Sequence, residues 1–190
     1  FNENEKDKVL QPKYLKGKMW YEITNPIYEK VKDKDDVTKM KYLDIHLWLP
    51  EDLLLKADKM TMAHSIELRV PFLDKEVMKL AQTIPVDYEI QKNTTKYIFR
   101  KAANEILPDE WATRPKWGFP VPFHYWIREE KYYNIVKEAF SEKWVNKFFK
   151  QDYLLKLLED HYNNKKQNGR KIYVIYTFIL WYKEYFINER

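Results

Sequence analysis

Two side chains of opposite charge stand two residues apart in an otherwise apolar segment of the chain. Glu67 and Arg69 alternate with Ile66, Leu68 and Val70. In an extended segment successive side chains point to opposite faces, so the carboxylate and the guanidinium would share one face. A carboxylate in such a place could take a proton from a reacting group, and a guanidinium could bind an anion. The alternative is a solvated edge or a structural ion pair, since charged side chains are mostly exposed.

A second group of charges lies in a segment rich in proline and glycine. Arg114 and Lys116 are separated by Pro115 and followed by Gly118, one of only three glycines in the chain. Lysine is a compact charge suited to phosphate, and glycine allows a ligand to approach the backbone closely. Loops that rigid elements position often contain functional residues. The alternative is an ordinary proline-rich connection whose cations face water.

The elements that would position these residues are helices. Pro50 suits the first position of a helix, and that helix must end before Pro71, because the residue preceding a proline is disfavoured in the α conformation. Residues between them recur at three- and four-residue spacing, which predicts one buried stripe. The stripe consists of Leu53, Leu54, Ala57, Thr61 and His64. Asp74 is expected to cap the next helix.

The rest of the chain also favours helices. One helix is expected to begin at Thr38. Another is expected after a loop at 87–93, with Thr94 or Thr95 as its N-cap, and three more at about 123–140, 150–165 and 171–187. No convincing strand is visible. The fold class expected for the chain is therefore all-α, with residues 1–37 as an N-terminal tail or linker and a short helix, and residues 38–190 as one helical part.

Composition excludes several classes of protein. The chain has 190 residues, no cysteine and a net charge of +5, so disulfides, thiolate metal sites and cysteine nucleophiles are excluded. The apolar run 172–182 is too short to span a bilayer and predicts a buried helix. The aromatic residues have core-like spacing and no nucleic-acid motif is present, so neither a nucleic-acid nor a membrane partner is expected.

Several motifs, in one consistent order, resemble those of the asparagine synthase family, the glutamine-hydrolysing type. The first is Met62-Ala63 followed by Glu67-x-Arg69-Val70-Pro71-Phe72-Leu73-Asp74. The later ones are Lys96-x-x-x-Arg100, Leu107-Pro108, Arg114-x-Lys116-x-Gly118-Phe119-x-x-Pro122, Trp126, and the pattern His161, Gly169, Trp181. The resemblance runs from about residue 40 to residue 186, most of the chain.

This resemblance implies the C-terminal helical part of an α/β ATP-pyrophosphatase synthetase domain, of the adenine nucleotide alpha-hydrolase-like type. The family binds ATP and Mg²⁺, adenylates the side-chain carboxylate of aspartate and transfers ammonia from glutamine to it, releasing AMP and pyrophosphate. Glu67 corresponds to the glutamate that assists proton removal from the attacking nitrogen, and Lys116 to the lysine that contacts the intermediate or pyrophosphate. The resemblance does not identify Mg²⁺ ligands. Substrate and phosphate contacts are expected from Arg69, Lys96, Arg100, Arg114 and Gly118.

The sequence also departs from the family pattern. The Ser-Gly-Gly-x-Asp-Ser phosphate loop and the glutaminase cysteine are absent, and the chain begins with Phe1. We therefore expect a cytoplasmic fragment that lacks the N-terminal glutaminase and the nucleotide-binding sheet, makes no asparagine alone, and has a homodimer as one option for its assembly. The alternatives are a related ligase that closes β-lactam rings, cyclises peptides or amidates another carboxylate, and a non-catalytic helical binding module.

Overall fold

The computed structural model describes residues 1–115, 118 and 121–188. Contacts divide the chain into unit 1, residues 1–17 and 118–190, and unit 2, residues 18–117. The expected helical class is confirmed, because the described strands are two short segments that form one hairpin. Among the described helices, none combines the length and the apolar character that crossing a membrane requires. The domain boundary expected between residues 37 and 38 stays a prediction.

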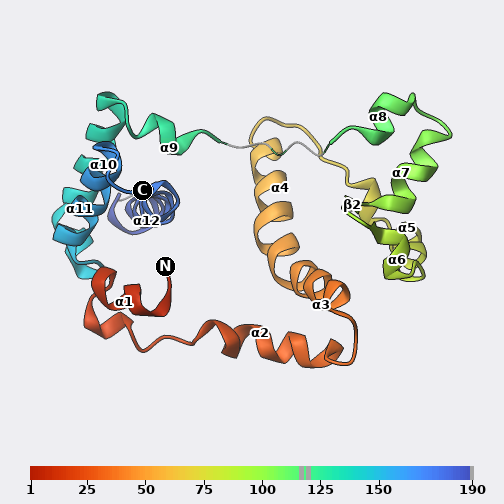
Figure 1. The fold of residues 1–190 in the computed structure, drawn as a ribbon. Helices are drawn as coiled ribbons and strands as arrows, with labels where there is room; N and C mark the ends of the chain where they lie inside the picture. The colour runs from red at the N-terminus through yellow and green to blue at the C-terminus, as the bar shows by residue number, and fades with distance from the viewer. Residues whose placement is uncertain (116–117, 119–120, 189–190) are drawn as a thin grey trace. The chain divides into compact units, whose positions relative to one another are not determined.

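Unit 1 is built mainly from three helices that contact one another, α10, α11 and α12 (Figure 1). The expected helix over 123–140 is two helices, because the chain turns between α9 and α10. The described elements are α1 (Glu3–Val9), η1 (Pro12–Tyr14), α9 (Phe123–Trp126), α10 (Glu130–Ser141), η5 (Lys143–Lys147), α11 (Gln151–Tyr162), α12 (Gly169–Tyr182) and the π-helix η6 (Lys183–Ile187).

The core of unit 1 follows from helical periodicity. On α12, Ile172, Ile175 and Ile179 recur at three- and four-residue spacing and are all buried. They meet Leu154 of α11 and Phe140 at the end of α10, both completely buried. Burying each such side chain contributes about 1.5–3 kcal/mol to the free energy of folding. The prediction of a buried helix at 172–182 is confirmed on this face of α12.

Residues 1–17, expected as a tail or linker, fold onto unit 1. Val9 at the end of α1 is 3% exposed and belongs to the core. The backbone N–H of Lys150 donates to the carbonyl of Val9 at 2.8 Å, and Leu10 forms an isolated antiparallel bridge with Phe149. These contacts join residues far apart in the sequence, so local composition could not reveal them.

Unit 2 contains the segments on which the sequence placed the candidate site. Helical structure continues through α3, η3 and α4, so Pro50 lies inside a π-helix rather than at the start of a new helix. The described elements are α2 (Trp20–Tyr28), η2 (Glu29–Val31), α3 (Asp36–Leu43), η3 (Asp44–Leu54), α4 (Leu55–Met62), η4 (Pro71–Leu73), α5 (Lys75–Gln82), α6 (Val86–Glu89), β1 (Ile90–Gln91), β2 (Thr94–Thr95), α7 (Tyr97–Asn104) and α8 (Asp109–Thr113).

Two local predictions in unit 2 have different outcomes. Asp74 caps α5 as expected, because its side chain accepts a hydrogen bond from the N–H of Glu76 at 2.8 Å. The expected caps Thr94 and Thr95 instead form β2, which pairs antiparallel with β1. Residue 96 then precedes α7 in the left-handed conformation, so a hairpin replaces the expected loop and cap.

The expected stripe of buried residues on α4 is wrong within this chain. Leu53 is 37% exposed and His64 is also exposed, while Ala57 and Thr61 are only half-buried. Among the described residues of unit 2, only Ala112 is buried. The apolar residues are spaced as in a helix, but none of the described residues of unit 2 covers the face that they define.

Candidate functional site

The segment that contains Glu67 begins where α4 ends. The N–H of Ile66 donates to the carbonyl of Thr61, and the N–H of Ser65 to that of Met62, both at 3.0 Å. This pair of bonds is the Schellman pattern that ends helices. Ser65 has a φ of 57°, in the left-handed region that glycine usually occupies at this position. The chain therefore leaves the helix sharply and is non-helical from Ile66, as the sequence predicted.

Glu67 and Arg69 are in contact. Arg69 Nη2 lies 2.7 Å from Glu67 Oε1, and the two side chains are 81% and 69% exposed, respectively. An ion pair in this environment contributes about 0–1 kcal/mol, so it contributes little to the stability of unit 2. The geometry agrees with the prediction that the two charges share a face. It fits an exposed ion pair and equally a carboxylate open to a substrate.

The side chain of Arg100 donates hydrogen bonds to backbone carbonyls of unit 2. Its Nε donates to the carbonyl of Thr95 at 3.1 Å. Its Nη1 donates to the carbonyls of Ala112 at 2.9 Å and Arg114 at 2.8 Å. One side chain therefore joins β2, the end of α8 and the residue that follows α8. These partners are carbonyl oxygens, whereas the sequence predicted a phosphate.

The other predicted phosphate-binding residues lie nearby in the chain. Lys96 is exposed and has a φ of 58°. The side chain of Arg114 is exposed while its carbonyl accepts from Arg100. Gly118 is exposed, and a Cβ there would meet nothing within 4 Å. Lys116, the second predicted catalytic residue, lies outside the described residues. Among the predicted site residues that are described, the structure thus joins Glu67 to Arg69 and Arg100 to Arg114.

A groove of about 580 Å³ opens beside Arg100. It lies within unit 2, between the β1–β2 hairpin, α7 and the end of α8. Arg100 and Lys101 are the charged residues that line it, and the other lining residues are mainly threonine and asparagine. Cations without neighbouring carboxylates favour a polar or anionic ligand over a cation.

The motif His161–Gly169 has a packing role in unit 1. His161 is completely buried, and its Nδ1 accepts the N–H of Asn168 at 3.1 Å. The proton is therefore on Nε2, which donates to the carbonyl of His124 at 2.8 Å. A Cβ on Gly169 would lie 2.6 Å from the Cβ of His124. The motif holds α11, α12 and α9 together, a role that the sequence pattern alone does not reveal.

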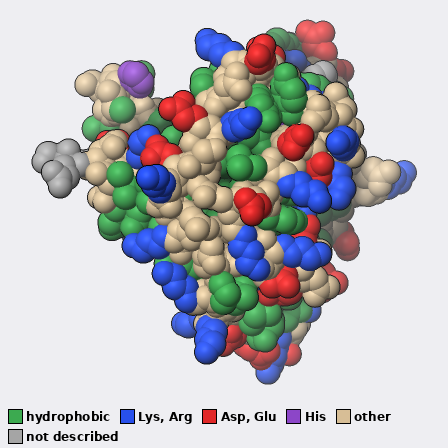
Figure 2. Space-filling view, turned by 90° about the vertical axis from the view of Figure 1, so that its left-hand side faces the viewer, with side chains coloured by type: hydrophobic (Ala, Val, Ile, Leu, Met, Phe, Trp, Pro, Cys, Tyr) green, Lys and Arg blue, Asp and Glu red, His purple; other side chains and the backbone are tan. Residues whose placement is uncertain are grey.

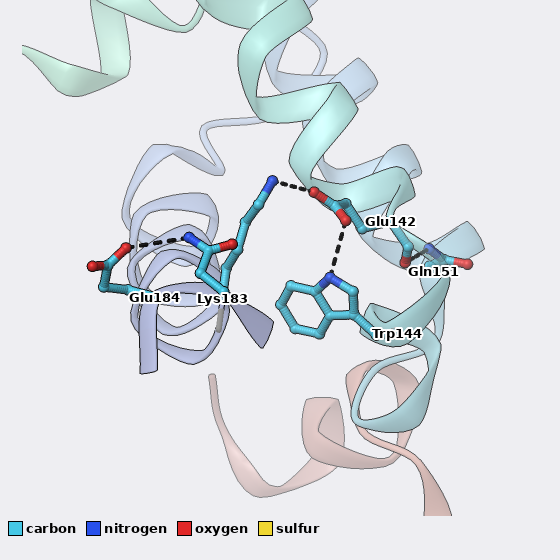
Figure 3. A network of polar contacts seen from close by, with 6 residues as sticks. Glu142, Trp144, Gln151, Lys183 and Glu184 are labelled. Atoms are coloured by element: carbon cyan, nitrogen blue, oxygen red, sulfur yellow. Dashed lines mark hydrogen bonds and ion pairs between the residues drawn. The ribbon is translucent and has the colours of Figure 1, made fainter. Parts of the chain in front are cut away.

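A polar network in unit 1 was missed by sequence reasoning (Figure 3). Glu142 Oε1 pairs with Lys183, and Oε2 accepts from Trp144 Nε1 at 3.0 Å. The hydrogen bond from Lys183 is the main cause that lowers the pKa of Glu142, and the same bond raises the pKa of Lys183. The network ties the end of α10 to η6. No local motif signals it, because its members come from separate helices.

The described residues form no metal cluster. The face that Figure 2 presents has no basic patch. Among the described residues, no group of three or more His, Cys, Asp or Glu could hold a metal ion. Figure 2 shows lysine and arginine side chains interspersed with aspartate and glutamate over one face. That pattern agrees with a solvated, lysine-rich surface on this face.

Comparison with known proteins decides the family. The sequence profile described as "Asparagine synthase" matches residues 2–183. The chain belongs to the asparagine synthase family. It is 42% identical over 185 residues to "Asparagine synthetase [glutamine-hydrolyzing] 1" of Bacillus subtilis. The aligned segment covers 96% of this chain and 28% of that protein. The resemblance stated from the motifs is therefore confirmed, and so is the assignment of the chain to a helical part of a family member.

Other members of the asparagine synthase family match shorter parts of the chain. "Asparagine synthetase [glutamine-hydrolyzing] 3" of Bacillus subtilis is 39% identical over 83 residues, 44% of this chain and 13% of that protein. "Asparagine synthetase [glutamine-hydrolyzing]" of Gallus gallus is 41% identical over 69 residues, 35% of this chain and 12% of that protein. No solved structure gives a significant match. The chain thus spans about 28% of the length of the first Bacillus relative.

Proposed function

We propose that this chain is part of a glutamine-dependent asparagine synthetase. Such an enzyme uses ATP and Mg²⁺ to adenylate aspartate, transfers ammonia from glutamine to the acyl-adenylate, and releases AMP and pyrophosphate. The observation that carries the proposal is the 42% identity, over 96% of the chain, to a protein named asparagine synthetase. A cytoplasmic location belongs to the same proposal.

Glu67 is the proposed base for nitrogen transfer. Ammonia that attacks an acyl carbon acquires positive charge, so a nearby carboxylate stabilises this state and can take the proton. The exposure of Glu67 supports this role, because its carboxylate is open to a ligand. Arg69, whose Nη2 lies 2.7 Å from Glu67 Oε1, would orient the carboxylate. The sharp end of α4 at Ser65 places both residues outside the helix.

A departing pyrophosphate needs positive charge around it. Lys116 is the proposed catalytic cation, with Arg114 and Lys96 as further phosphate contacts and Gly118 as a point of close backbone approach. The exposed side chains of Arg114 and Lys96 support this assignment. Mg²⁺ would neutralise phosphate charge when bound. Since the described residues contain no acidic cluster that could hold a metal, we assign Mg²⁺ no ligand in this chain.

The surface of unit 2 supports a partner within the synthetase. Among its described residues only Ala112 is buried, while Trp48, Leu53, Phe72 and Leu80 are among many large apolar side chains that are exposed. Exposed apolar surface on this scale marks an interface. The proposal is that the nucleotide-binding sheet of the synthetase domain covers it, and that the glutaminase supplies ammonia.

The test of Glu67 uses the complete synthetase. Glu67→Gln keeps the size of the side chain and removes the base, so ATP–pyrophosphate exchange with aspartate should persist while asparagine formation falls by about 10²–10⁴-fold. Glu76→Gln is the matched control, because Glu76 forms an equally exposed pair with Lys79 at 2.7 Å in the same unit. If asparagine formation by Glu67→Gln equals that of the control, Glu67 is a surface ion pair and not the base.

Three further measurements test the rest of the proposal. Lys116→Ala should impair adenylation, and normal adenylation kinetics would remove Lys116 from the site. The purified 190-residue chain should form no AMP from ATP and aspartate, because the sequence lacks the phosphate loop. Adenylation of another carboxylate in place of aspartate by the complete enzyme would assign the chain to a different ligase of this family.

A further inference from the structure

We propose that Arg100 is a positioning residue, which fixes the backbone between α8 and Arg114, and that it is not a ligand for phosphate. This inference rests on the proposed function, because Arg114 belongs to the proposed phosphate-binding set. It changes the role of Arg100 from contacting the substrate to holding a segment that does so. The basis is the set of three hydrogen bonds that Arg100 makes to backbone carbonyls.

The end of α8 explains why a donor is needed there. The last carbonyls of a helix have no partner inside the helix. α8 has only five residues, and its C-cap, Arg114, has a ψ of 133°, outside the helical range. Nη1 of Arg100 supplies donors to Ala112 and Arg114, two carbonyls at this end. A cation at a helix C-terminus also opposes the negative end of the helix dipole.

The other side of the guanidinium is fixed as well. Nε donates to Thr95, the last residue of β2. Arg100 itself is held in α7, where its N–H donates to the carbonyl of Lys96 at 2.9 Å. A planar guanidinium can bridge carbonyls in fixed directions, whereas the lysine ammonium is a single point charge. The arrangement therefore uses a property specific to arginine.

Phosphate binding by the same nitrogens would break these bonds. Nε and Nη1 would have to leave three carbonyls, and one of these belongs to Ala112, which is buried. A buried carbonyl without a partner is costly. The neighbouring Lys101 lines the same groove, and among the described residues its Nζ contacts the ring of Tyr97 and no backbone carbonyl. Nε and Nη1 of Arg100 are thus committed to the backbone, and Lys101 is the lining cation that can meet an anion without breaking these bonds.

Hydrogen exchange on the full chain tests the proposal without any activity. In Arg100→Gln and in Arg100→Lys, amides at 109–114 should exchange at least about tenfold faster, because the donors to this segment are lost. Lys101→Gln is the matched control: it removes a charge from the same groove but no bond to α8, so exchange at 109–114 should not change. Amides of α10–α12 show in each variant whether the molecule remains folded. Unchanged exchange at 109–114 in both Arg100 variants would overturn the proposal.

Kinetics of the complete synthetase separate this proposal from the proposed function. A positioning role predicts that Arg100→Lys lowers kcat by at least about tenfold and leaves the KM for ATP within about twofold, while a phosphate ligand predicts a raised KM. Inorganic pyrophosphate alone serves as the binding probe in an Arg114→Ala background, where Arg100→Lys should cause no further loss of affinity because Arg100 acts through the segment that contains Arg114. A raised KM together with a further loss of pyrophosphate binding in that background would overturn the positioning role. If the complete protein makes no asparagine but 109–114 exchanges as expected, the proposed function fails and the structural role of Arg100 stands.

Discussion

At Gly169 the absence of a single methyl group decides how closely α12 approaches α9. The hydrogen of the glycine leaves room for the Cβ of His124, which would lie 2.6 Å from a Cβ at this position. His161 is fixed just beside it by two hydrogen bonds. A contact that short cannot be relieved by a flexible side chain end, because Cβ atoms follow the backbone.

We predict that Gly169→Ala destabilises the protein by about 1–3 kcal/mol, because the added methyl group overpacks this contact. The measurement is the free energy of unfolding in urea. Gly17→Ala is the control, since a Cβ there meets nothing within 4 Å, and its effect should stay within about 0.5 kcal/mol. Equal effects of the two substitutions would mean that the close approach to His124 has no energetic consequence.

The helices of unit 1 are joined by side chains as well as by the core. Glu142 at the end of α10 connects to η6 through Lys183 and to η5 through Trp144 (Figure 3). Lys183 and Trp144 lower the pKa of Glu142 below its usual value of 4.5. A group with a depressed pKa in the folded state stabilises the protein above its unfolded pKa, and this stabilisation is lost as the pH falls through the folded pKa.

We therefore predict that Glu142→Gln lowers the stability by about 1 kcal/mol at pH 7. The difference from wild type should shrink as the pH falls below the usual carboxylate pKa and through the lowered pKa of Glu142, because the wild-type carboxylate then becomes protonated. Thermal melts at several pH values provide the measurement. Glu184→Gln is the control, because Glu184 accepts a long hydrogen bond of 3.3 Å from exposed Asn188. A difference for Glu142→Gln that is independent of pH would contradict the assignment.

At the scale of the whole molecule, the two units differ in what they bury. The core cluster lies entirely in unit 1, and residues 1–17 contribute Val9 to it. In the described part of unit 2, hydrogen bonds and helix caps hold the elements together with little apolar burial. Burial is the main favourable term in folding, so the two units should differ in local stability.

We predict that amides of α10, α11 and α12 exchange at least about a hundredfold more slowly than those of α3 and α4 in the 190-residue chain, because local opening is cheaper where few apolar contacts are lost. Amide hydrogen exchange followed by mass spectrometry measures this difference. In the complete synthetase, protection of α3 and α4 should rise, since the proposed sheet would cover their apolar face. Equal protection of the two units in the isolated chain would contradict the prediction.

Several features could be predicted because they depend on neighbours in the sequence. Asp74 caps α5 because its own side chain reaches the N–H two residues on. The sequence placed the end of the helix before Pro71, because proline restricts the residue that precedes it, and the chain leaves α4 earlier, through the turn at Ser65. Glu67 and Arg69 meet because they lie two residues apart in a short non-helical segment. In each case the cause and the effect lie within a few residues of each other.

The sequence by itself thus determined the family, the helical class and the pairing of Glu67 with Arg69. The tertiary structure alone decided that residues 1–17 belong to unit 1, that the periodic face over 53–64 stays largely exposed within the described part of unit 2, and that Arg100 binds the carbonyls of Thr95, Ala112 and Arg114. The physical reason is distance along the chain. Periodicity tells which face of a helix is apolar, but the segment that covers that face, and the acceptors that a long side chain reaches, depend on how separate elements meet.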